Sequence, residues 1–188
     1  MELAELIERW NSGDGKPYKG NLIDMDAYEA DPDNLGCMCA QGQVLHLLGG
    51  MEPRDLFGKD QAAADKLTAD LLNISSAHAI LLRNVNDSVD GAPSIVLTDP
   101  GRVLGDQWSK LLDFWWWLDQ LTPADWEKVA AAGDAAGAAA WAAAPASNEI
   151  QGAALMTERK QPFFFLPIFG FADPDAIPAR PETYGTTR

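Results

Sequence analysis

The chain has 188 residues, of which 47% are hydrophobic and 22% charged, a composition typical of a folded globular domain rather than of a disordered chain. Its 28 acidic and 14 basic residues give a formal net charge of −14, which disfavours nucleic acids and anionic membranes as partners. The longest apolar stretch, residues 163–172, contains Pro167 and Gly170 and is shorter than the roughly 20 residues that span a bilayer.

Two cysteines, Cys37 and Cys39, are separated by one residue, and a disulfide between such near neighbours is sterically awkward. We therefore expect free thiols in a reducing compartment. The N-terminal residues MELAELIERW carry acidic side chains where a secretion signal carries basic ones, so the sequence predicts no signal peptide.

Helical periodicity dominates the first half of the chain. The spacing of apolar residues predicts helices over residues 2–10, 22–29, 37–48, 60–72 and 76–85, separated by loops rich in Gly, Pro and Asp. Gly49 and Gly50 end the third of these helices. Ser75 or Ser76 is the expected N-cap of the fifth helix, which stops at Asn86.

In the second half, residues 94–98 (SIVLT) are rich in β-branched side chains and predict an extended segment. A long helix is predicted from Asp99 to Leu121. Its start is indicated by an N-cap acid, Asp99, followed by proline at the first helical position. Thr122-Pro123 repeats that signal. Trp115–Trp117 cannot all face one core, so at least one tryptophan must face another helix or a partner.

Residues 129–144, which are mostly Ala, and residues 148–160 predict two further helices. From Gln161 onward the prolines exclude helix and predict an extended arm, whose Phe side chains must cover the domain's own surface or a neighbouring subunit. The sequence thus predicts an all-α fold of about eight helices, with an acidic helical domain at residues 1–160 and an extended Pro- and Phe-rich arm at residues 161–188.

Cysteine chemistry is one hypothesis for the function. If Cys39 lies at a helix N-terminus, the helix dipole favours its thiolate and lowers its pKa. With His78 as a base and Asn86 as an orienting amide, Cys37 or Cys39 would complete a Cys–His–Asn arrangement in the chain order of papain-like hydrolases. His78 lies in a helical stretch rather than on a strand, so buried structural thiols are the competing interpretation.

The same thiols with His46 and His78 have the ligand count of a structural zinc site, but their spacing does not match the familiar finger. The acidic run at residues 24–33 lacks the Gly and the terminal Glu of a calcium loop, and the chain contains no phosphate-binding or dinucleotide loop. We therefore expect no metal and no cofactor.

Two other features are candidates for contact with a ligand or partner. Asn86 and Asp87 end a predicted helix ahead of a loop, where function is often located, although turn and capping roles explain these residue types equally. The second feature is the set of aromatic side chains that are too many to be buried in one core. Together the candidate ligand- or partner-binding residues are Asn86, Asp87, Trp116, Phe163, Phe164, Phe165 and Phe169.

Three segments carry a resemblance to known proteins. They are CMCAQGQ at residues 37–43 leading to HAILLRNVNDSVDGAPSIVLTDP at 78–100, the Ala- and Trp-rich stretch at 129–144, and NEIQGAALMTERKQPFFFLPIFGFADPDAIPARPETYG at 148–185. In these segments the chain resembles uncharacterised proteins of actinobacterial phages (bacteriophages of actinobacteria) and prophages. The resemblance implies a location in the host cytoplasm of the infected cell or, alternatively, in the virion, and it implies no activity.

The leading function hypothesis is a non-enzymatic interaction protein, expected to be a homo-oligomer, that binds a host or defence-system protein or a small signalling molecule. The alternatives are a virion or assembly component and a cysteine-dependent hydrolase that uses Cys37 or Cys39. An acidic mimic of nucleic acid is a further alternative, but the acidic residues are spread over loops and helix ends.

Overall fold

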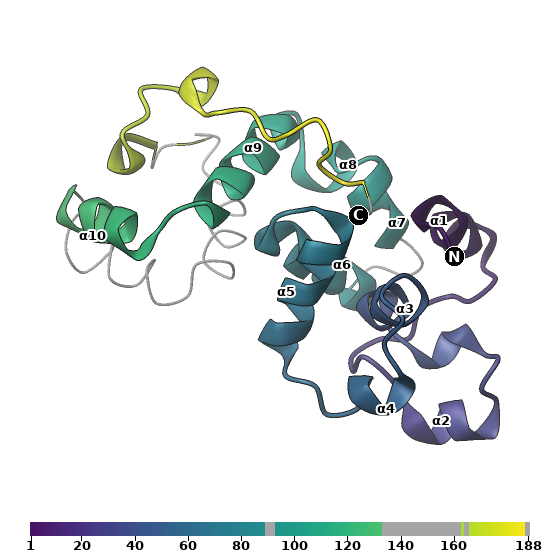
Figure 1. The fold of residues 1–188 in the computed structure, drawn as a ribbon. Helices are drawn as coiled ribbons and strands as arrows, with labels where there is room; N and C mark the ends of the chain where they lie inside the picture. Colours follow the sequence, from purple (N-terminus) through teal and green to yellow (C-terminus); the bar gives the residue numbers. More distant parts are fainter. Residues whose placement is uncertain (89–92, 133–162, 164–165, 187–188) are drawn as a thin grey trace.

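The structure is a computed structural model that describes residues 1–88, 93–132, 163 and 166–186. Within these residues it contains helices and an isolated bridge between Ile23 and Met38 but no strand, which confirms the all-α class. None of the described helices is long and apolar enough to cross a bilayer. The α-helices of Figure 1 are α1 (Leu3–Ser12), α2 (Met25–Ala30), α3 (Ala40–Leu47), α4 (Pro53–Leu56), α5 (Gln61–Leu72), α6 (Ser76–Ser88), α7 (Pro93–Thr98), α8 (Gly101–Leu104), α9 (Trp108–Asp119) and α10 (Pro123–Ala132).

Helix starts follow the capping signals of the sequence. The Ser75 hydroxyl accepts a hydrogen bond from the backbone N–H of His78 at 3.2 Å, so the predicted cap of α6 is confirmed. At α10, the Asp125 N–H donates to the Thr122 hydroxyl oxygen while the Thr122 N–H donates to the Asp125 carboxylate. These reciprocal bonds satisfy backbone donors that the first turn would otherwise leave unpaired.

The prediction of an extended segment at residues 94–98 is wrong, because these residues form α7. The Thr98 hydroxyl donates to the Ser94 carbonyl at 2.9 Å, and Val96 is completely buried. Helix α7 packs against α1 and α6, and this tertiary contact outweighs the weak β preference of the branched side chains. A short apolar run does not by itself distinguish a strand from a buried helical turn.

The long helix predicted from Asp99 to Leu121 is also corrected, since it divides into α8 and α9. Gly105 separates them with φ +78° and ψ −168°, a conformation that glycine adopts without a steric penalty. The break turns the chain, so that α8 packs on both α7 and α9. Of the helix predicted at residues 129–144, residues 129–132 form the end of α10, and its remainder and the helix predicted at 148–160 lie outside the described residues.

Helix α6 contacts α3, α5, α7 and α9, and around it lies the main hydrophobic core. The end of the chain joins this core through Phe163, Leu166 and Ile177, which are each 4% exposed or less. A second, smaller core joins the loop before α2 to η1 (Leu35–Cys37) and α4, and it contains Ile23 and Leu56.

The described part of the C-terminal arm contains no α-helix. It forms two short 3-10 turns, η2 (Leu166–Phe169) and η3 (Pro174–Ala176), and otherwise runs as an irregular strap along α9 to the side of the fold where α7 lies (Figure 1). The groove that the arm requires is therefore present in its own chain, and the described arm residues complete the same core as residues 1–132.

The backbone of α3 approaches the preceding loop closely at Gly42. A Cβ atom at this position would lie 2.0 Å from the carbonyl oxygen of Leu22, which is far inside van der Waals contact. The Leu22 carbonyl also accepts the Cys39 N–H at 3.1 Å, so the loop cannot move away without losing this bond.

We predict that Gly42→Ala lowers the free energy of unfolding by about 2 kcal/mol, because overpacking a tight contact typically costs about 1–3 kcal/mol. Helix propensity alone predicts the opposite sign, a gain of about 1 kcal/mol. Urea denaturation of the two proteins measures the difference, and a stabilised variant would contradict the close approach.

Candidate functional site

The three consecutive tryptophans of α9 face different surroundings. Trp115 is 1% exposed and lies in the main core. Trp116 meets the ring of Tyr184 edge-on with 5.5 Å between ring centroids, and Trp117 meets Phe171 edge-on at 4.8 Å. The three tryptophans thus do not share one environment, as predicted, but Trp116 and Trp117 contact the C-terminal arm of the same chain rather than the expected helix or partner.

Phe169 anchors the first described stretch of the arm. Its ring packs edge-on against Phe114 at 5.2 Å, Trp117 at 5.9 Å and Trp126 at 6.4 Å, and it thereby joins α9 to α10. Phe163 is 4% exposed in the main core. The side chains of Phe163 and Phe169, expected at a partner interface, therefore pack within this chain, and Phe164 and Phe165 lie outside the described residues.

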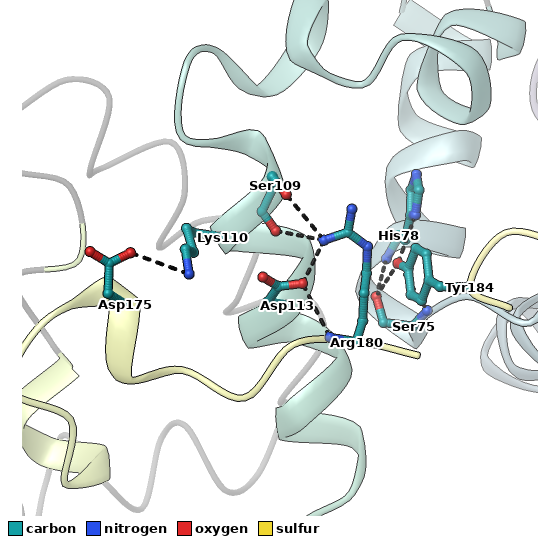
Figure 2. A network of polar contacts seen from close by, with 8 residues as sticks. All are labelled: Ser75, His78, Ser109, Lys110, Asp113, Asp175, Arg180 and Tyr184. Atoms are coloured by element: carbon teal, nitrogen blue, oxygen red, sulfur yellow. Dashed lines mark hydrogen bonds and ion pairs between the residues drawn. The ribbon is translucent and has the colours of Figure 1, made fainter. Parts of the chain in front are cut away.

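A buried ion pair holds the middle of the arm on α9 (Figure 2). The Arg180 guanidinium donates to the Asp113 carboxylate and to the Ser109 carbonyl at 2.8 Å, and the Arg180 backbone N–H donates to the same carboxylate at 3.2 Å. The Asp113 side chain is 9% exposed and that of Arg180 is 20% exposed. A second, more exposed pair joins Lys110 to Asp175 at 3.3 Å.

The Arg180 guanidinium also lies between two aromatic rings. It is 5.7 Å from the Trp108 ring centroid and 5.3 Å from the Tyr184 ring centroid. Tyr184 in turn stacks on His78 with 5.7 Å between centroids and 13° between planes. Cation–π attraction and stacking thus add to the ion pair and connect the arm with α9 and α6.

The hydrogen bonds around His78 define its tautomer. His78 Nε2 lies 2.8 Å from the Val96 carbonyl, which can only accept, so Nε2 carries the proton. Nδ1 is then an acceptor, and the Tyr184 hydroxyl donates to it at 2.8 Å. The Tyr184 oxygen accepts from the Ser75 backbone N–H at 3.3 Å. Both imidazole nitrogens are therefore occupied within the fold.

Burial shifts the ionisation of both rings in this network. It lowers the pKa of His78 to about 4, and the nearby positive charge of Arg180 acts in the same direction. Burial raises the pKa of Tyr184 to about 12, so its hydroxyl remains protonated and available to donate at neutral pH. The pair is consequently neutral over the physiological range.

The end of the arm is attached to the C-terminus of α5. Asn73, in the left-handed conformation with φ +50°, donates through its side-chain amide to the Thr183 carbonyl at 2.6 Å. Its own carbonyl accepts the Gly185 N–H at 3.0 Å. A cavity of about 200 Å³ lies at this end of the arm, lined in part by His78 and Arg180.

Cys37 and Cys39 are both 2% exposed. Cys39 is the N-cap of α3, and its sulfur accepts from the Gly42 N–H at 3.4 Å. The predicted lowering of the thiol pKa is wrong, because burial outweighs these backbone N–H groups and raises the pKa of Cys39 to about 11. Burial likewise raises the pKa of Cys37.

Asn86 and Asp87 form a structural corner at the end of α6. The Asn86 amide is buried and donates to the Tyr18 carbonyl at 2.8 Å. The Asp87 carboxylate accepts from the Gly20 N–H at 3.0 Å and from the Asn86 amide at 3.1 Å. The corner therefore ties the loop at residues 18–20 to α6, and Asp87 remains exposed at its rim.

The side chains of the hypothetical Cys–His–Asn arrangement thus bond to different parts of the fold: Cys39 to its own helix, His78 to the arm and α7, and Asn86 to the loop at 18–20. His46 donates from Nδ1 to the Met51 carbonyl at 2.7 Å. Across the part of the chain that the structure describes, no three His, Cys, Asp or Glu side chains are grouped as metal ligands.

Sequence reasoning did not anticipate the buried polar network that joins α3, α5 and α6. The Gln41 amide donates to the Asp65 carboxylate at 2.8 Å and to the Ala79 carbonyl at 3.1 Å. Arg83 pairs with the same carboxylate at 3.0 Å, and Gln61 donates to the Gln41 carbonyl oxygen at 3.0 Å. Each of these groups has its hydrogen-bonding partners within the chain, so the network orients the three helices.

Gln43 has a similar role on the other side of α3. It is completely buried, accepts from the Trp10 indole N–H at 2.8 Å, and donates to the carbonyls of Gly15 and Leu35 at 2.9 Å. The role of both glutamines could have been predicted, since they lie within a helix that the apolar pattern predicts to be buried, and a buried amide requires hydrogen-bonding partners.

Comparison of the chain with family models, with curated proteins and with solved structures finds no match.

We predict that Asp113→Asn lowers the free energy of unfolding by about 3 kcal/mol, the lower end of the range for a broken buried pair, since Arg180 retains some contact with water. Lys110→Met is the matched control, because it breaks the exposed ion pair between the same two elements and should cost about 1 kcal/mol or less. Equal losses in urea denaturation would show that the buried pair does not fasten the arm.

The depressed pKa of His78 predicts a pH dependence of stability. The unfolded chain binds the extra proton below about pH 6.5 and the folded chain only below about pH 4, so stability rises with pH across this window, by about 3 kcal/mol in total. Subtracting the pH profile of the free energy of unfolding of His78→Gln from that of the unchanged protein removes the contribution of the carboxylates. NMR titration of His78 in the native protein should give a midpoint near 4, and a midpoint near 6.5 would refute the buried neutral ring.

Proposed function

We propose that this chain is a non-enzymatic protein that binds another protein in the cytoplasm of an actinobacterial cell infected by a phage. The phage and host parts of the proposal rest on the resemblance of its CMCAQGQ, Ala/Trp-rich and C-terminal segments to phage proteins. The protein-binding part is supported by one observation: the described groups best suited to catalysis are used inside the fold, whereas many acidic groups face solvent without a partner.

The state of the candidate catalytic groups favours binding over catalysis. A nucleophilic thiol requires access and a low pKa, but both thiols are buried and burial raises the pKa of each. A general base requires a free lone pair on the imidazole, and Tyr184 already donates to Nδ1 of His78. These groups support the structure rather than a cysteine-dependent hydrolase.

The acidic surface supports a protein partner of opposite charge. Within the described residues, the carboxylates between positions 21 and 60 make no ion pair, although Asp24 and Asp60 cap helices α2 and α5. Attraction to a basic surface accelerates association and favours correct partners. The homo-oligomer stays a prediction. It was expected because the apolar arm needs a surface to cover, and for residues 166–186 that surface is provided by α9 of the same chain.

Binding of a small polar molecule is the second candidate function. A cavity of about 290 Å³ lies between α5, α6 and α9, with the partly exposed Trp116 in its wall. An indole face beside several polar groups is suited to a flat, hydrogen-bonding ligand. The polar side chains that line the cavity are Lys66, Asp70, Asn73, Ser76, Asp119 and Gln120.

Affinity capture tests the protein-binding proposal. Immobilised chain and a Cys37→Ser/Cys39→Ser variant are incubated with actinobacterial cytoplasm, and retained proteins are identified by mass spectrometry. Serine is a good N-cap, so the variant should keep α3 intact and retain the same partner in a comparable amount. Retention of no protein in stoichiometric amount, or loss of retention in the variant alone, would contradict a thiol-independent binding function.

A further inference from the structure

Phe57 is the most exposed large apolar side chain in the described part of the molecule, at 65% exposure. It follows α4 directly, and its neighbour Leu56 is buried in the second core. An aromatic ring that remains in water contributes little to folding, whereas aromatic side chains are enriched at the centres of protein interfaces. Its high exposure makes it a candidate contact for a partner.

The backbone holds Phe57 in a fixed orientation. Phe57 has φ −65° and ψ 121°, Gly58 follows with φ +73°, and the Lys59 N–H donates to the Leu56 carbonyl at 3.2 Å. These values describe a type II turn with Phe57 at its second position and glycine at the third, where positive φ is required. Because the turn is hydrogen-bonded, the ring is presented to a partner at a small cost in conformational entropy.

A hollow adjoins the exposed ring. A cavity of about 230 Å³ is lined on one side by residues 21–23, which lead into α2, and on the other by residues 56–59 and Gln61, so that Lys59 is the charged residue of its wall. The same two segments share the second core, so the walls of the hollow are fixed relative to each other. Met25 and Tyr28 of α2 pack against this second core, which also contains Leu56 of α4.

The chain segment that contributes most of this hollow is strongly acidic in sequence, although the charged residue in the wall itself is Lys59. Residues 21–60 hold eight carboxylates against two basic side chains, Arg54 and Lys59, and within the described residues none of the eight makes an ion pair. Asp26 and Asp55 are exposed on α2 and α4. The eight carboxylates are those of Asp24, Asp26, Glu29, Asp31, Asp33, Glu52, Asp55 and Asp60.

We infer that the α2–α4 face, defined as the Phe57 turn, the adjoining hollow and the carboxylates of residues 21–60, is where a basic segment of a partner protein binds. An apolar side chain of that segment packs against Phe57 and fills the hollow, while its Lys or Arg side chains pair with Asp26, Asp55 and their neighbours. This inference rests on the proposed protein-binding function and assigns it a surface and a partner chemistry.

The charge of the face decides between the possible occupants. A second copy of this chain would bring its own −14 formal charge to an acidic surface, which is unfavourable. A nucleic acid or an anionic membrane is repelled for the same reason. A cationic protein segment can pair with the carboxylates and also pack against the apolar ring. We therefore assign the face to such a segment.

A synthetic 14-residue peptide of alternating lysine and leucine is the probe, and isothermal titration calorimetry measures its Kd. Phe57→Ala should weaken binding at least tenfold, and Asp26→Asn/Asp55→Asn about fivefold, with a smaller salt dependence. A peptide of alternating glutamate and leucine should show no measurable binding. Phe57→Ala should keep the native melting temperature, because the ring is exposed and its loss leaves no cavity in either core.

Two matched controls separate this face from general attraction to an acidic protein. Leu67→Ala removes another exposed apolar side chain, on α5, and Asp99→Asn/Asp106→Asn removes two exposed charges near α8. Both should change the Kd less than twofold, and equal effects of test and control variants would overturn the inference. If affinity capture succeeds but Phe57→Ala retains the cellular partner fully, the protein-binding function stands and the α2–α4 face is wrong.

Discussion

Helix α9 constrains the rest of the structure, because it is apolar or aromatic on more than one side. Trp115 and Leu118 are buried in the main core, while Trp116 and Trp117 are only partly buried and contact the C-terminal arm. A helix of this kind cannot leave its second side in water without exposing several large rings. The C-terminal arm covers that side, and proline keeps the arm extended enough to follow α9 over its length.

The polar contacts of the arm explain why it takes one position rather than many. Apolar burial favours coverage of α9 but does not by itself select a register. The pairing of Arg180 with Asp113, and of Tyr184 with His78, fits a single alignment, since each buried polar group would lose its partner if the arm shifted. The networks of Gln41 and Gln43 orient α3 in the same way.

This use of polar groups bears on function. Thiols, imidazoles and amides that could support catalysis are instead caps, acceptors and donors inside the fold, and the pKa shifts of Cys37, Cys39 and His78 follow from burial rather than from activation. In the part of the chain that the structure describes, the exposed features include carboxylates without an ion pair and the hydrogen-bonded Phe57 turn. These properties are the basis for proposing recognition rather than catalysis, with the α2–α4 face as the proposed contact surface.

The sequence by itself determined the helical class, a serine cap before α6, the cap at Thr122, the divergence of the three tryptophans and the absence of α-helix from the described arm, because each depends on local geometry and composition; that the arm contains the 3-10 turns η2 and η3 was not predicted. It did not determine that residues 94–98 are helical, that Gly105 divides α8 from α9, or that Cys39 has a raised pKa. Those outcomes depend on which surfaces are buried against each other. His78 shows the difference most clearly: its residue type suggests a base, but only the tertiary structure places Tyr184 and Val96 on its two nitrogens and leaves it neutral.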